Sequence, residues 1–181
     1  SNSLFRFRKG RFTMGFLMFL ARKISLQNQD NDIQYQLTTI NNKLQDYTNY
    51  ASILSQDSVS ISDISALPSS LFAQGMADLT NAHYQALQIS NAQFGQAMGS
   101  GMFGNNQNVQ IQEVAKQKMY ENARKQIQKQ LAMKLNEEEK SLQAKRTRLE
   151  ARDAEIQQEL QGMDQKIAGG IKSSISTYGL Q

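Results

Sequence analysis

The residue types that most often perform catalysis or bind metals are scarce in this chain. Its 181 residues include one histidine, His83, and no cysteine or tryptophan. Without cysteine the chain has no thiolate nucleophile, and general-base chemistry near neutral pH would rest on a single imidazole. Nor does His83 have a second histidine or a cysteine with which to complete a metal site. We therefore interpret it as a partly buried interface histidine and predict no metal and no other cofactor.

Carboxylates are the remaining candidates for acid–base chemistry. Their densest group is Glu137-Glu138-Glu139. Successive residues on a helix point in different directions, so these three side chains form no converging pair of the kind that hydrolases use. The group is typical of a solvated helix face. We predict that the chain is not an enzyme, has no catalytic residues and has no small-molecule substrate.

A glycine-rich segment could in principle cradle a phosphate. Gly95, Gly99, Gly101 and Gly104 lie close together, but no strand precedes them and no Gly-Lys-Ser/Thr sequence follows. A phosphate-binding loop needs that context. The segment is better interpreted as a flexible bend between helices.

The elements around these residues are predicted to be helical. From Ile33 onward, apolar residues step by three and four, which places them on one stripe of a helix. Phe19 and Leu26 extend one register backwards in sevens. We expect an N-terminal helix over 16–54, whose stripe consists of Ile33, Leu37, Ile40, Leu44, Tyr47, Ala51 and Leu54.

The sequence of the middle of the chain, 55–106, indicates a linker, a short helix and the glycine-rich bend. Serine and aspartate cluster over 55–65, and Pro68 is the only proline. Alternating Val59-Ser60-Ile61-Ser62 leaves a short strand open as an alternative. With a serine at 69 or 70 as N-cap, we expect a helix over about 70–94. Its stripe would be Phe72, Met76, Leu79, His83 and Ala86 or Leu87.

The last helix is predicted to be the longest, over 107–168. In its middle only one residue per heptad is apolar, because Glu139, Arg146 and Asp153 occupy the other seam position. Gly169-Gly170 should end it, leaving an apolar tail over 169–181. The expected contact residues of helix and tail are Leu135, Leu142, Leu149, Ile156, Met163, Ile167, Ile171, Ile175 and Tyr178.

Each of the two long helices must bury its apolar stripe. Folding back on each other achieves this, so we predict an all-α protein, an antiparallel coiled-coil hairpin of a long N-terminal and a longer C-terminal helix. The lengths differ, so the middle helix or a neighbouring subunit must cover the surplus of the C-terminal helix.

The segment 1–15 forms a basic, phenylalanine-rich arm, which we expect to be disordered or an upstream extension if Met14 is the true start. A signal peptide is disfavoured because Arg22-Lys23 replaces a small-residue cleavage site. The arm and the start of the first helix could contact a membrane surface; nucleic acid is disfavoured as a partner. Localisation stays open between a bacterial cytoplasm and secretion without a typical signal peptide. The contact residues would be Arg6, Arg8, Lys9, Arg11, Phe16, Phe19, Arg22 and Lys23.

The stretch from Met14 to Lys23, the glutamine-rich heptad helix that follows and the charged C-terminal helix with its Ile-Lys-Ser-Ser-Ile tail resemble a group of bacterial helical-hairpin proteins. More distantly, the plan is similar to axial and tip subunits of flagella and type III secretion systems, whose terminal helices mediate assembly. The likeness covers both ends but not 55–106. It implies a structural or assembly protein whose partners are itself or other helical proteins. The alternative is a peripheral membrane-binding adaptor that uses the basic and apolar N-terminal arm.

Overall fold

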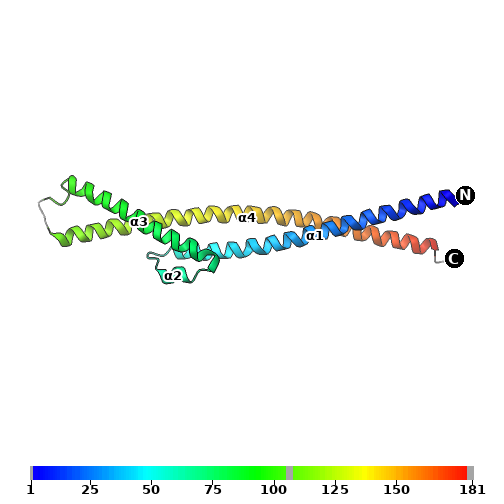
Figure 1. Cartoon of the computed structure of the whole chain (residues 1–181), viewed down its shortest axis with the longest axis horizontal. Coiled ribbons are helices and arrows are strands. Elements are labelled where there is room, and N and C mark those ends of the chain that lie inside the picture. Colours follow the sequence, from blue (N-terminus) through cyan, green and yellow to red (C-terminus); the bar gives the residue numbers. More distant parts are fainter. Residues whose placement is uncertain (1, 105–107, 179–181) are drawn as a thin grey trace. The chain divides into compact units, whose positions relative to one another are not determined.

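In the computed structural model, the backbone is described for residues 2–104 and 108–178, and the side chains for 15–104 and 108–169. These residues form α1 (Asn2–Leu54), α2 (Ile61–Ser65), α3 (Ser69–Gly99) and α4 (Val109–Tyr178) (Figure 1). No strand occurs in the described ranges. The all-α prediction is confirmed, and α1 packs against α4 as an antiparallel hairpin.

The chain divides into two compact units. Unit 1 contains residues 1–41 and 144–181, and unit 2 contains residues 42–143. Both long helices therefore contribute to each unit, while α2 and α3 belong to unit 2.

Unit 1 is held together by a narrow apolar seam between α1 and α4. Leu26 and Ile33 of α1 are buried against Ile156 and Met163 of α4. The half-buried side chains that pack against them are Phe19, Leu37, Leu149 and Leu160.

Unit 2 has two apolar clusters. In the first, Tyr50 and Leu54 of α1 pack with Leu135 of α4 and with residues of α2 and α3. The second cluster joins α3 to α4 through Ala82, Ala86, Ala123 and Ile127. Thus α3 covers the part of α4 within unit 2 that α1 is too short to reach.

The N-terminal helix begins earlier than predicted. It starts at Asn2, so the backbone of 2–15 continues α1 and is not a separate arm. No proline interrupts this segment, and an isolated glycine such as Gly10 or Gly15 costs a helix only about 1 kcal/mol.

A short helix replaces the strand considered at 59–62. The Ser60 Oγ accepts a hydrogen bond from the Asp63 backbone N–H, and the Ser60 backbone N–H donates to Asp63 Oδ2 over 2.8 Å. This reciprocal capping starts α2 at Ile61. The Ser60 backbone N–H and, second, the Ser60 hydroxyl, which donates to Asp63 Oδ2 over 2.9 Å, lower the pKa of Asp63.

The middle helix differs from expectation in its cap and its buried stripe. Pro68 occupies the cap position, and its carbonyl accepts from the Leu71 and Phe72 N–H groups. Most of the buried face is shifted by one residue from the predicted one, which leaves Phe72 40% exposed and His83 exposed, whereas the predicted alternative Ala86 is buried. Small side chains on this face let α3 approach its neighbours closely. The buried residues are Leu71, Gly75, Ala82, Ala86, Ser90 and Ala97.

The C-terminal helix does not end at Gly169-Gly170. Asn108 caps its start, with Oδ1 accepting from the Gln110 N–H over 3.1 Å, and the helix continues to Tyr178. Two glycines weaken a helix but do not remove a backbone donor as proline does. The helix therefore continues across them, because the flanking residues favour it.

Candidate functional site

The predicted seam residues lie at the helix contacts of their own units. In unit 1, Ile33, Ile40, Ile156 and Met163 are buried. In unit 2, Leu44, Leu54 and Leu135 are buried, and Tyr47 is half-buried. The remaining described members, Leu37, Leu142, Leu149 and Ile167, are also half-buried.

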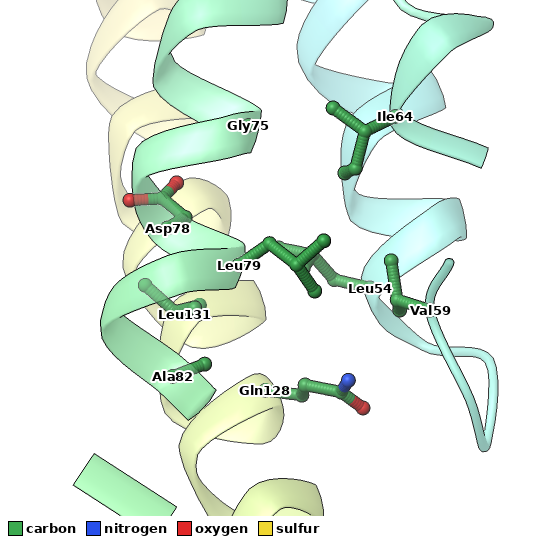
Figure 2. Close-up of a pocket in the computed structure, with 9 residues that line it drawn as sticks. All are labelled: Leu54, Val59, Ile64, Gly75, Asp78, Leu79, Ala82, Gln128 and Leu131. Carbon is green, nitrogen blue, oxygen red and sulfur yellow. The ribbon is translucent and has the colours of Figure 1, made fainter. Parts of the chain in front are cut away.

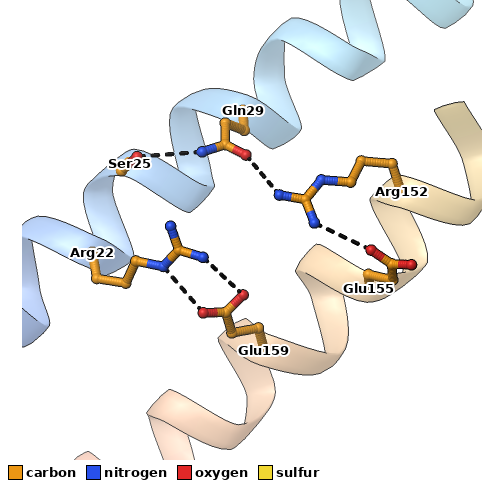
Figure 3. Close-up of polar contacts among 6 residues, drawn as sticks. All are labelled: Arg22, Ser25, Gln29, Arg152, Glu155 and Glu159. Atoms are coloured by element: carbon orange, nitrogen blue, oxygen red, sulfur yellow. Dashed lines mark hydrogen bonds and ion pairs between the residues drawn. The ribbon is translucent and has the colours of Figure 1, made fainter.

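Polar side chains line the unit 1 seam and set its register. The Arg22 guanidinium donates to both Glu159 carboxylate oxygens, over 3.1 and 3.3 Å (Figure 3). About two turns away, Arg152 bridges Gln29 and Glu155 at 3.1 Å each. These exposed contacts favour one alignment of the two helices more than they add free energy, because surface ion pairs contribute roughly 0–1 kcal/mol.

Lys23 makes a further ion pair in unit 1. Its Nζ lies 2.7 Å from Asp164 Oδ1. Arg22 and Lys23, both predicted as membrane or polyanion contacts, are therefore occupied by acidic partners on α4.

Two carboxyl groups meet at the edge of the same seam. Asp30 of α1 and Asp153 of α4 hydrogen-bond to each other, and Gln34 Nε2 donates to Asp153 Oδ2 over 3.0 Å. Each aspartate has a buried Oδ1 without another donor. A proton held between the two carboxyl groups would satisfy both oxygens. The hydrogen bond from Asp153 lowers the pKa of Asp30, and the same bond, with burial, raises the pKa of Asp153.

A second polar contact is buried in unit 2. Tyr50 is fully buried, and its hydroxyl donates to Asp78 Oδ2. Burial first, and then the hydrogen bond and charge of Asp78, raise the pKa of Tyr50 well above its ordinary value. This bond ties α1 to α3.

A small cavity lies next to this contact. Its space is about 10 Å³, on the order of one water molecule. Gln128 projects from α4 toward it between Ala82 and Val59 (Figure 2), and its buried Nε2 has no hydrogen-bond partner among the described residues. Gly75 lies on the opposite side. The cavity is too small for a metabolite, so its polar lining is a packing feature of unit 2.

His83 does not occupy a buried interface. Its side chain is exposed, and Nδ1 hydrogen-bonds the Tyr120 hydroxyl across α3 and α4. An open groove of about 330 Å³ runs past it, lined also by Ile61, Tyr84 and Arg124. The Arg124 guanidinium donates to the Val59 carbonyl over 2.8 Å, which connects α4 to the loop before α2.

Exposed apolar side chains follow one another on α1. Phe16 is 49%, Leu17 62% and Met18 73% exposed, although Phe19 joins the seam. Ile24 is also exposed. The seam occupies one face of α1, and this apolar block, Phe16–Met18 with Ile24, lies outside it.

Several predicted contact residues lie outside the described side chains. They are Arg6, Arg8, Lys9, Arg11, Ile171, Ile175 and Tyr178.

Sequence reasoning missed the aspartate pair and the capping of α2. The spacing places Asp153 as a charged residue in a seam position, but its partner can only be identified from the register of the hairpin. Ser60-x-x-Asp63 had a signal of its own, because serine followed three residues later by an acid resembles a capping box.

Within the described ranges, no three His, Asp or Glu side chains gather in a way that could hold a metal ion. In the same part of the chain, no helix has the length and apolarity needed to cross a membrane. Comparison of the chain with protein-family models, curated proteins and solved structures gave no match.

Proposed function

We propose that this chain is a non-enzymatic structural or assembly protein that binds copies of itself or other helical proteins through coiled-coil helix contacts. The observation that carries the proposal is the exposed apolar block on α1. Three consecutive large apolar residues, Phe16, Leu17 and Met18, are between 49% and 73% exposed. Burial of such surface against another helix is favourable by roughly 25 cal/mol per Å².

The position of the block supports a contact with a further helix. Phe19 and Leu26 already direct α1 toward α4. Leu17 and Met18 precede Phe19 directly, so they point to other sides of α1. A helix that is apolar around its circumference is typical of a segment surrounded by partners. The hairpin supplies one partner, and an assembly would supply the others.

A secretion- or filament-type subunit is the finer form of this proposal. The similarity to axial and tip subunits, in which terminal helices assemble, favours it, as does a helical hairpin that brings the two ends of the chain into unit 1. The same arrangement suits a scaffold that recruits other helical proteins.

The proposal is tested by placing charge in the apolar block. Leu17→Glu with Met18→Glu should reduce the light-scattering mass measured across a concentration series. Tyr35→Glu with Thr38→Glu is the matched control, because both positions are exposed on α1 in unit 1. An unchanged mass in the first variant, or an equal loss in both, would contradict the proposal. Circular dichroism checks that each variant remains helical.

A peripheral membrane adaptor is the second candidate function. Residues 1–29 carry six basic residues and no acid, a composition suited to anionic lipid. Two of the six, Arg22 and Lys23, are paired with acids on α4, which weakens this candidate. Sedimentation with phosphatidylserine vesicles tests it: loss of sedimentation in the Leu17→Glu, Met18→Glu variant supports it, and no sedimentation of the wild-type chain ends it.

A further inference from the structure

The end of unit 2 where α3 finishes and α4 begins is nearly free of charge and carries several exposed apolar side chains. The sequence has no Asp, Glu, Lys or Arg from residue 79 to residue 112. The side chains of Met98, Met102, Val109, Ile111 and Val114 are between 46% and 72% exposed here. We call these five residues the apolar tip.

The turn that carries Met102 has a defined backbone. Gly101 and Gly104 have φ angles of 72° and 56°, in the left-handed region that glycine adopts without strain. The Met102 N–H donates to the Ala97 carbonyl over 3.1 Å, and the Gly101 N–H to that of Met98 over 3.3 Å. These bonds satisfy the carbonyls at the end of α3, as in a Schellman motif.

Phe103 anchors the same turn to α3. Its ring lies 5.9 Å from that of Phe94, and Lys116 Nζ of α4 lies 5.7 Å from the Phe94 centroid. Phe103 is half-buried, whereas its neighbour Met102 is 72% exposed. The turn therefore presents Met102 outward from an ordered backbone, which lowers the entropy cost of burying it in a contact.

The chemistry of the tip favours a second copy of this chain as its occupant. In a two-fold contact, the same patch of two copies comes together, so a patch with a net charge would repel itself. An uncharged patch avoids this like-charge repulsion. The first charges beyond the stretch in α4 are Glu113 and Lys116, one of each sign. They leave the contact without a net charge.

A hydrocarbon environment suits the tip less well. Gln93, Gln96 and Gln110 accompany the apolar residues, and an amide buried in lipid without partners costs several kcal/mol. In a contact with a second copy, the amides of that copy can form hydrogen bonds with these glutamine side chains. Nucleic acid is also disfavoured, because affinity for phosphates requires a concentration of basic residues.

We propose that the apolar tip docks on the same tip of a second copy. This gives the chain a self-contact in unit 2, separate from the apolar block of α1 in unit 1. This inference rests on the proposed assembly function and supplies one of its contacts. Because a chain with two independent self-contacts can extend into larger assemblies, the two contacts have distinguishable effects on mass.

The experiment compares four chains by light-scattering mass: wild type, the α1 variant Leu17→Glu with Met18→Glu, the tip variant Met102→Asp with Ile111→Asp, and their combination. We expect the α1 variant to stop at twice the 20.4 kDa chain mass and the combination at 20.4 kDa. A tip variant with wild-type mass would overturn the tip contact. An α1 variant with wild-type mass would instead overturn the proposed function.

The control for the tip variant is Met133→Asp with Gln130→Asp, exposed positions on α4 in the same unit, which should keep wild-type mass. Because the chain has no cysteine, Met102→Cys provides a second measurement. A bis-maleimide reagent should link two Met102→Cys chains at least tenfold faster than two Met133→Cys chains. Equal rates would contradict docking at the tip. Binding of a monomeric chain to phosphatidylcholine vesicles through Met102 would overturn docking on a second copy and would make a membrane the partner of the apolar tip.

Discussion

Asp30 of α1 and Asp153 of α4 face each other across the unit 1 seam and hydrogen-bond to each other. The pKa of Asp153 is raised, so its contribution to stability is full at low pH and is lost as the pH rises through that raised pKa. The pKa of Asp30 is lowered, so its contribution is lost as the pH falls through that lowered pKa. The pair therefore stabilises unit 1 most between the two values.

Replacement of Asp153 by asparagine should remove the loss of stability at higher pH. An amide can donate to Asp30 as the protonated carboxyl does, so we expect Asp153→Asn to raise the free energy of unfolding at neutral pH by about 1 kcal/mol. Its stability should also depend less on pH than that of wild type. Urea unfolding followed by circular dichroism at several pH values measures both effects. Asp32→Asn, which removes the same charge from an exposed position, is the control; equal pH profiles for all three chains would refute the shared proton.

The Tyr50 hydroxyl should contribute to the stability of unit 2. Tyr50→Phe leaves the ring in place but removes the donor to Asp78, and a hydrogen bond to a charged group contributes about 1.5–3 kcal/mol. We expect a loss of that size in the free energy of unfolding. Tyr84→Phe, at a side chain 61% exposed, should change it by less than about 0.5 kcal/mol. Similar losses in both variants would mean that the Tyr50–Asp78 bond has no special role.

A spectroscopic titration reports on the same group. Because the pKa of Tyr50 is raised, Tyr50 should remain un-ionised in the folded chain at a pH where a free tyrosine is ionised. Ultraviolet absorbance at alkaline pH measures the fraction ionised. Complete ionisation while the circular dichroism remains native would contradict the burial of Tyr50.

Two glycines of α3 should respond oppositely to alanine. A Cβ at Gly75 would lie 2.9 Å from Leu67 Cδ1 and 3.0 Å from Ile64 Cγ2, so Gly75→Ala crowds the contact of α3 with α2. We expect a cost of about 1–3 kcal/mol. A Cβ at Gly95 would meet nothing within 4 Å, so Gly95→Ala should stabilise α3 by about 0.5–1 kcal/mol. Thermal unfolding compares the stability of the two variants. If Gly75→Ala leaves the stability unchanged, α2 moves to accommodate the added methyl group at little cost.

The apolar spacing predicted much of the helix pairing because one stripe per helix sufficed to specify it. The steps from Ile33 and the sevens through Leu149 and Ile156 identified positions that are buried or half-buried at the contacts. The same spacing misplaced the stripe of α3. There Gly75 and Ala82 are buried, and their small side chains give a weak hydrophobic signal while permitting close packing. Ala86, one of the two alternatives predicted at its position, is buried.

Helix ends were predicted less well than helix faces. The start of α1 and the end of α4 were assigned from a basic run and a glycine pair, and neither feature stops a helix that neighbouring residues favour. The Asp30–Asp153 pair depends on the register between residues 123 positions apart, which no local pattern encodes. The apolar tip was not predicted for a different reason, because the glycines in the same segment indicated only a bend between helices.

The most direct test of the assembly proposal is the mass of the wild-type chain in solution as its concentration rises. Light scattering after size exclusion should give discrete or growing oligomers above the 20.4 kDa monomer, because both the α1 block and the apolar tip remain exposed in the single chain. A monomer of 20.4 kDa at the highest concentration reached would contradict self-assembly and leave foreign helical proteins or a membrane as the partners of these surfaces.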